Sequence, residues 1–331
     1  MFGPRGGVGG GDSKLKTIGR TIIRIIPVLI LVSFFSSFYV ELLPGDPAIR
    51  LLGQERAQEP GARELVNREL RLDENVIVRY GKWLGDAVTG DLGESVRTLG
   101  LKVSDTIRQR LPITLELTLV AQALALILAI PLGVYAAYRA GRRVDRALNA
   151  ASFAAISLPQ FLVGILLIFI LFNQLDLLPP QGWTRLTEWD WWDHSRRLIM
   201  PVVALALTEV AVFQRLLRAD MMATLQNDFV LTAKAKGMSP AHILFRHALR
   251  PSSFSLITLA GVSTGRLIGG TVIIEVLFQL PGMGLKMVDS ITGNDLVVLQ
   301  GLVLVVAVAY ILLNMLVEIT YALLDPRIRR G

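Results

Sequence analysis

Few residues of this chain could carry out covalent chemistry. It has no cysteine, which excludes disulfides, thiolate catalysis and cysteine-based metal sites, and its three histidines have no metal-binding spacing such as HExxH. We expect His194, His242 and His247 to be polar loop residues. The chain also lacks the GxxxxGK(S/T) loop that binds nucleotide phosphates. These absences predict a protein that is not an enzyme, holds no metal or other cofactor and cannot hydrolyse ATP by itself.

Several ionisable side chains fall inside or near long apolar stretches of the sequence. A charge there costs ~2.5 kcal/mol or more at the bilayer centre, so it must face protein, water or a partner. These residues are Glu116, Glu209, Arg266, Glu275 and Glu318. We expect Glu116 and Glu318, which lie near the ends of apolar stretches, to snorkel or to pack between helices.

Three of these charges are candidates for lining a translocation pathway: Arg266, Glu209 and Glu275. Arg266 is the best candidate because it lies nearest the middle of its apolar stretch and its guanidinium could meet a substrate carboxylate. The alternative is a structural ion pair with Glu209 or Glu318. Glu275 is nine positions from Arg266, on the opposite side of a helix, and the alternative role for Glu275 is to fix the turn that follows.

One polar segment, residues 228–250, interrupts the apolar C-terminal half and has the local chemistry of two short helices. Asp228 suits the N-cap of the first helix, and Lys234 and Lys236 suit its last turn, where the helix dipole favours cations. Gly237 then supplies a flexible stop.

A second helix start follows at once. Ser239 is an N-cap residue and Pro240 suits the first helical position, so a helix over 241–249 should run into the next apolar stretch. The segment therefore predicts a positively charged helical hairpin at a membrane surface.

The overall composition places these elements in a membrane. The 331 residues are 52% hydrophobic and only 18% charged, and the mean hydropathy is +0.52, which is too apolar for an ordinary soluble domain. The net charge of +7 does not indicate nucleic-acid binding, because the lysines and arginines are spread along several loops. Positively charged cytoplasmic loops explain it better.

Apolar stretches of about 20 residues predict an all-α polytopic membrane protein with six transmembrane helices. The predicted spans are residues 21–43, 113–138, 150–175 with a kink at Pro159, 198–217, 255–280 and 296–323. Residues 44–112 are polar and predict a small helical external subdomain. A cleaved signal peptide is the rival interpretation of the first span, which we disfavour because no small-residue cleavage site follows it.

Charges in the loops orient these spans. The turn after the second span carries four arginines against the single Asp145, which indicates a cytoplasmic loop: Arg139, Arg142, Arg143 and Arg146. The polar loop 219–252 then also lies in the cytoplasm, together with the terminal tails 1–20 and 324–331.

The predicted span 255–280 carries a glycine every four residues, at Gly261, Gly265 and Gly269. Small residues at this spacing let another helix approach closely, so we expect this face to serve helix packing.

The hairpin resembles the cytoplasmic "EAA" loop of ABC importer permeases, in the D-Y-V-x-T-A-x-A-K-G-L-S form found in oligopeptide and dipeptide permease B subunits. The matching residues are Thr232, Ala233, Ala235, Lys236, Gly237 and Ser239. Leu231 and Thr232 replace the Glu and first Ala of other importers, a departure common in the peptide branch. Residues 269–284 also resemble the family's G-G-x-V-x-x-E-x-x-F-x-x-P-G-x-G pattern, with Glu275 at its Glu, and residues 325–329 resemble its closing L-D-P-R-x-R.

The resemblance implies a type I ABC importer permease in the bacterial cytoplasmic membrane, working by alternating access. A homologous second permease subunit would complete the pathway, an extracytoplasmic binding protein would deliver di- or oligopeptides or similar small solutes, and two ATPase domains holding ATP and Mg would grip the hairpin. The residues implied in this ATPase coupling are Asp228, Thr232, Ala233, Ala235, Lys236, Gly237, Ser239, Pro240 and Arg246.

The alternative function is a secondary transporter or channel without ATPase partners. It would need ion-coordinating carboxylates near the midplane and inverted repeats, and the sequence shows no convincing repeat. A membrane enzyme would need a metal ligand set or a nucleophile with its base, which the sequence also lacks.

Overall fold

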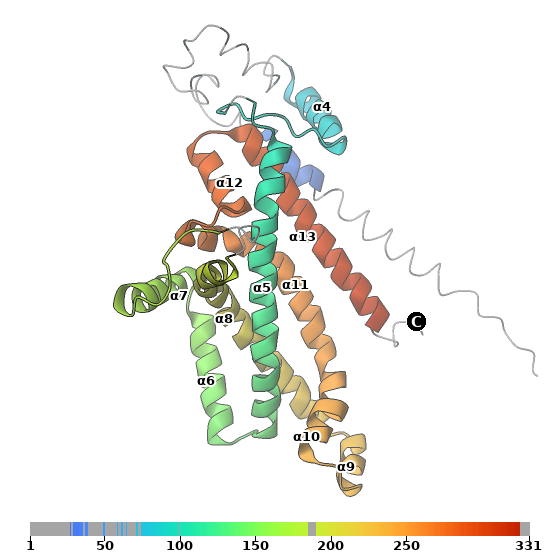
Figure 1. Cartoon of the computed structure of the whole chain (residues 1–331). Coiled ribbons are helices and arrows are strands. Elements are labelled where there is room, and N and C mark those ends of the chain that lie inside the picture. Colours follow the sequence, from blue (N-terminus) through green and yellow to red (C-terminus); the bar gives the residue numbers. More distant parts are fainter. Residues whose placement is uncertain are drawn as a thin grey trace, which may run out of the picture. The chain divides into compact units, whose positions relative to one another are not determined.

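The computed structural model describes residues 74–98, 100–184 and 190–324, with scattered positions between 27 and 71 (Figure 1). Within these residues the regular secondary structure is helical, and the only extended pairing is one isolated bridge between Glu94 and Lys102, which confirms the all-α prediction. The chain forms two compact units, residues 108–289 and residues 1–107 with 290–331.

The unit 108–289 contains most of the described helices, long and short. They are α5 (Val103–Tyr138), which begins just before the unit boundary, α6 (Arg143–Ser157), α7 (Gln160–Leu167), η1 (Ile168–Gln174), α8 (Trp191–Thr224), α9 (Asp228–Ala235), α10 (Pro240–His242), η3 (Ile243–Ala248), α11 (Leu249–Phe278) and α12 (Met283–Thr292), which ends just after it. Such helices suit a bilayer because all their backbone hydrogen bonds are made within one segment.

Four helical segments of the described chain are long and apolar enough to cross a membrane: Val103–Tyr138, Trp191–Thr224, Pro240–Phe278 and Leu296–Leu316. A fifth exists if α6 and the following α7–η1 run form one span, although the two are bent by 99°. The bend lies at Pro159, which fixes its own φ and holds the preceding Leu158 in extended backbone. The predicted first span, 21–43, lies largely outside the described residues, so the count of six remains a prediction.

Helix α8 forms the centre of this unit and packs against α6, α7 and α11. Its buried face includes Leu205, Phe213 and Leu217, all with no exposed surface. α5 presents alanines every four residues to the same core, and an added Cβ at Gly133 of α5 would lie 3.1 Å from Gln214 O and from Leu217 Cβ. The close approach of α5 and α8 therefore depends on small residues.

The predicted glycine face of α11 is less enclosed. Gly265 is buried, Gly261 is half-buried and Gly269 is exposed, with nothing within 4 Å of an added Cβ at Gly269. Its role in helix packing remains a prediction.

The second unit contains α4 (Val76–Val88) and α13 (Leu296–Leu324). α4 coincides with an amphipathic stretch of the predicted external subdomain, and its Tyr80 hydroxyl lies 2.7 Å from Ser33 Oγ. Ser95 Oγ donates to Asp295 at the start of α13, which joins the loop after α4 to that helix.

Candidate functional site

The polar segment 228–250 forms the predicted hairpin. Gly237 has φ +73°, a conformation that glycine adopts without strain, and its N–H closes the turn onto Lys234 O at 2.9 Å. Ser239 is the N-cap of α10, its hydroxyl accepting a hydrogen bond from His242 N at 3.4 Å, and Pro240 occupies the first helical position. The local chemistry of the sequence therefore gives a sharp turn between two arms.

One detail of this hairpin differs from expectation. Asn227, not Asp228, is the N-cap of α9, and Asp228 lies in the first turn, where its charge still complements the helix dipole. The second arm runs into the next apolar stretch, as predicted. It continues from α10 through the π-helical turn η3 into α11, so the apolar helical run extends from Pro240 to Phe278.

A small core of its own holds the hairpin together. Val230, Ala233 and Ile243 are buried, with Leu225 and Met238 packed against them. Ala233 is thus an internal residue that keeps the arms together. The other predicted coupling residues are exposed: Asp228, Thr232, Ala235, Lys236, Gly237, Ser239, Pro240 and Arg246.

The same hairpin exposes three large apolar side chains, Phe229, Leu231 and Phe245. Exposed groups of this size beside lysines and Arg246 are typical of a surface that binds another protein. The sequence pattern indicated Leu231 only as a departure from the family form and did not single out either phenylalanine, although one lies on each arm of the predicted hairpin.

An ion pair joins α8 and α11 in the apolar part of the unit. Arg266 Nη2 donates to Glu209 Oε1 at 2.9 Å. This contact is the structural ion pair that the sequence offered as the alternative role of Arg266. The Arg266 side chain is nevertheless 65% exposed, whereas that of Glu209 is 2% exposed. Glu209 Oε2 and the hydroxyl of Thr208 are buried without a hydrogen-bond partner in the described part of the chain.

Glu275 lies apart from this pair and is fully buried. Its carboxylate accepts from Thr114 Oγ1 at 2.7 Å and from Leu285 N at 3.0 Å, and Met283 N donates in turn to Thr114 Oγ1 at 2.8 Å. An added Cβ at Gly282 would collide with the Glu275 carboxylate. The observed contacts are those of the alternative role, fixing the turn between α11 and α12.

The expectation that every histidine is a polar loop residue is wrong for His194. It lies in the first turn of α8 and is 3% exposed. Its Nε2 is 2.7 Å from Glu116 Oε1 and its Nδ1 is 2.6 Å from Thr184 O. Glu116, expected to snorkel or pack, therefore pairs with a histidine 78 positions away, a contact that local sequence does not reveal.

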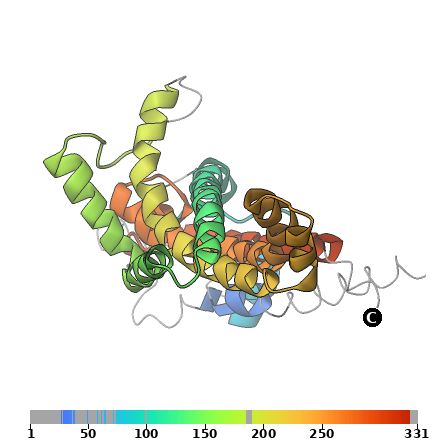
Figure 2. The same ribbon diagram turned by 90° about the horizontal axis from the view of Figure 1, so that it is seen from below.

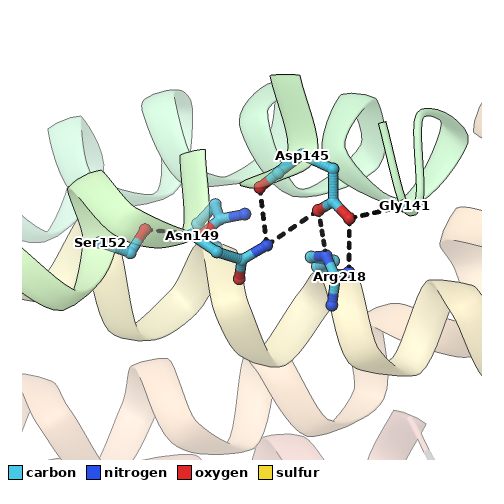
Figure 3. Close-up of polar contacts among 6 residues, drawn as sticks. Gly141, Asp145, Asn149, Ser152 and Arg218 are labelled. Atoms are coloured by element: carbon cyan, nitrogen blue, oxygen red, sulfur yellow. Dashed lines mark hydrogen bonds and ion pairs between the residues drawn. The ribbon is translucent and has the colours of Figure 1, made fainter. Parts of the chain in front are cut away.

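A second ion pair, which the sequence did not indicate, joins α6 and α8 (Figure 3). Arg218 donates through Nε and Nη2 to the two carboxylate oxygens of Asp145, at 2.5 and 2.7 Å. Gly141 N and Asn149 Nδ2 donate to the same carboxylate at 2.9 and 2.8 Å. One turn deeper, Ser152 Oγ donates to Gln214 Oε1 at 2.7 Å.

The α5–α6 turn and the hairpin lie at the same end of the unit, and Figure 2 looks onto this end (Figures 1 and 2). Within the described residues, one continuous helical run from Pro240 to Phe278 thus carries both the second arm of the hairpin and the exposed Arg266. No group of three or more potential metal ligands occurs in the ranges that the structure describes.

Residues 129–330 match the family described as binding-protein-dependent transport system inner membrane component. The chain belongs to this family. Over 312 residues, 94% of its length, the permease is 36% identical to the probable peptide ABC transporter permease protein y4tP of Sinorhizobium fredii and to the oligopeptide transport system permease protein AppB of Bacillus subtilis, covering 98% of each. It is also 33% identical, over 95% of its length and 99% of the relative's, to the glutathione transport system permease protein GsiC of Escherichia coli.

Family membership makes this permease a multi-pass inner membrane protein, the membrane component of an ABC importer. Importers of this family combine such a component with ATPase and substrate-binding partners. The resemblance seen in the hairpin is confirmed at the level of the family by a match that includes the whole unit from α6 onward.

Proposed function

We propose that this permease is the membrane subunit of an ATP-driven importer of peptides or similar small solutes. The observation that supports it most is the hairpin with its exposed Phe229, Leu231 and Phe245, because its second arm, which carries Phe245, is continuous with the membrane helix α11. Relatives named for peptide, oligopeptide and glutathione transport favour a substrate with peptide bonds and a free carboxylate.

In this proposal energy enters through the hairpin. Two ATPase domains, which hold ATP and Mg, grip the hairpin of this chain and that of a homologous second permease subunit. Their closure moves α9 and α10, and because η3 is helical and continuous, the displacement passes into α11 without a flexible joint. α11 carries Arg266, so the movement changes its position relative to Glu209 on α8.

The orientation follows from charge. The hairpin and the arginine-rich turn 139–146 lie in the cytoplasm, with both chain termini, and the end bearing His194 faces the extracytoplasmic binding protein. Arg266 is the group that meets the substrate, since a guanidinium with an exposed side chain can bind a peptide carboxylate through two parallel hydrogen bonds.

The test is a substitution at the hairpin turn. Gly237→Asp places a side chain at φ +73°, a conformation that glycine adopts more readily than aspartate, adds a negative charge to the turn of the positively charged hairpin and changes the angle between the arms. We expect the complex to assemble and to hydrolyse ATP, while peptide uptake into proteoliposomes falls by roughly tenfold or more, a loss of about 1.4 kcal/mol in coupling.

Gly100→Asp is the matched control, because Gly100 also has positive φ, +78°, and open space around an added Cβ. Normal uptake by the Gly237 variant would contradict the coupling role. Uptake that persists without ATP and depends on an ion gradient would instead favour a secondary transporter.

A further inference from the structure

A hollow of about 410 Å³ lies between α6 and α8, within the range of roughly 300–1,000 Å³ typical of small-molecule sites. Its lining includes Asn149, Ile156, Val212, Arg215, Leu216 and Arg218. Two guanidinium groups thus share one hollow with three aliphatic side chains, and no carboxylate lines it.

The polarity of this hollow changes along its length. On α6, Asn149 precedes Ile156 by seven positions, a rise of about 10 Å. On α8, which runs the opposite way, Val212 precedes Arg218 by six positions, a rise of about 9 Å. Each helix therefore places a polar or charged side chain toward the arginine-rich end of the unit and an aliphatic one deepest, and on α8 Arg215 and Leu216 lie between these two. An anionic phospholipid in the leaflet at that end has the same polarity.

The positive charge of the hollow is only partly compensated. Arg218 is paired with Asp145, which is buried behind it. The side chain of Arg215 makes no hydrogen bond or ion pair with any residue of the described ranges, and its guanidinium carbon lies 3.9 Å from the centre of the Phe153 ring. A guanidinium held on an aromatic face keeps its N–H groups for another acceptor.

The residues around the hollow add both apolar side chains and positive charge. Phe153 and Ile156 of α6 are exposed apolar side chains, which suits contact with acyl chains. The preceding turn exposes Arg142, Arg143 and Arg146, which attract anionic headgroups.

We propose that this hollow binds an anionic phospholipid of the inner leaflet. Its phosphate lies between Arg215 and Arg218, and an acyl chain lies along Ile156, Val212 and Leu216. The bound lipid ties the first half of the bent α6–α7 segment to the central helix α8. The choice of the inner leaflet rests on the orientation proposed above, with the arginine-rich turn 139–146 in the cytoplasm, and the proposal is independent of the substrate that the chain transports.

The test uses the purified importer complex titrated with phosphatidylglycerol, phosphatidylcholine or inorganic phosphate and followed by native mass spectrometry. We expect phosphatidylglycerol to be retained in preference to phosphatidylcholine. Arg215→Gln should weaken this retention about fivefold or more, the effect of removing one basic contact with an anionic headgroup. Arg215→Lys should keep most of it.

Arg250→Gln is the matched control, since Arg250 is an exposed arginine near the start of α11, at the hairpin end of the unit, and does not line the hollow. Leu216→Trp is the second variant, because it fills the aliphatic part without altering charge and should also reduce retention. A photoreactive acyl chain incorporated in the membrane should label residues between 153 and 156 or between 212 and 216.

Three outcomes would overturn the proposal. Equal retention of the two lipids would remove the role of charge, and displacement of the lipid by inorganic phosphate would make the site one for a free anion. Absence of label from the complex, with crosslinks from position 216 to the second permease subunit, would show that a protein covers the hollow.

Discussion

Among the described residues, two arginine–carboxylate ion pairs connect the central helix α8 to its neighbours, and they are built differently. In the pair with α6, both carboxylate oxygens of Asp145 accept hydrogen bonds from Arg218, and Gly141 and Asn149 supply two more. In the pair with α11, Glu209 receives one hydrogen bond from Arg266, and its second oxygen is buried without a partner in the described part of the chain.

The packing around the two pairs differs in the same way. Near the Asp145 pair, Gly133 lets α5 approach α8 so closely that a Cβ would touch Gln214 and Leu217. Near the Arg266 pair, Gly269 of α11 faces open space. A fully bonded carboxylate in a tight contact suits a rigid joint. A buried carboxylate with an unused oxygen beside an exposed guanidinium suits a group that changes partner, because such an oxygen is costly to leave unsatisfied in every state.

The largest effect on stability is expected from Arg218→Ala. Asp145 is 3% exposed and would lose its only cation among the described residues, and breaking such a pair on one side costs about 3–5 kcal/mol. The measurement is thermal unfolding of the purified complex. Arg218→Ala combined with Asp145→Ala should recover part of the loss, since no charge then stays buried. A loss below about 1 kcal/mol would show that this joint is not rigid.

A smaller effect is expected when helix contacts are overpacked. Gly133→Val forces a branched side chain against Gln214 and Leu217 and should cost about 1–3 kcal/mol. Gly269→Val, the control, meets nothing within the chain and should change the unfolding temperature of the isolated chain little. If Gly269→Val instead prevents assembly with the second permease, the predicted glycine face packs against that subunit.

What could be predicted from sequence is the chemistry that acts locally. The hairpin turn follows from Gly237, Ser239 and Pro240, which act within a few residues of each other, and the bend of the predicted third span follows from Pro159. Asp145 looked like a single acid in a basic turn because its partner is 73 positions away. The pairing of His194 with Glu116 could not be predicted for the same reason, because the two residues are 78 positions apart. Contacts between distant segments depend on how helices pack, which periodicity and capping do not encode.

The smallest stability effect is expected from Glu209→Gln, and its comparison with the matched neutral substitution Asp145→Asn is the sharpest test of the two pairs. Asp145→Asn removes hydrogen bonds to a charged partner in an enclosed site and should cost about 1.5–3 kcal/mol. Glu209→Gln leaves Arg266, 65% exposed, to be solvated, so the free energy of unfolding should fall by less than about 1 kcal/mol.

Peptide uptake should respond in the opposite order, with the larger loss in the Glu209 variant. Glu209→Gln should lower transport roughly tenfold at unchanged ATPase activity, because Arg266 no longer exchanges a charged partner for the substrate. The fraction of the Asp145→Asn complex that remains folded should transport normally. Equal loss of stability in both variants, with uptake reduced in proportion, would show that the Glu209 pair is as structural as the Asp145 pair and that the substrate contacts other residues.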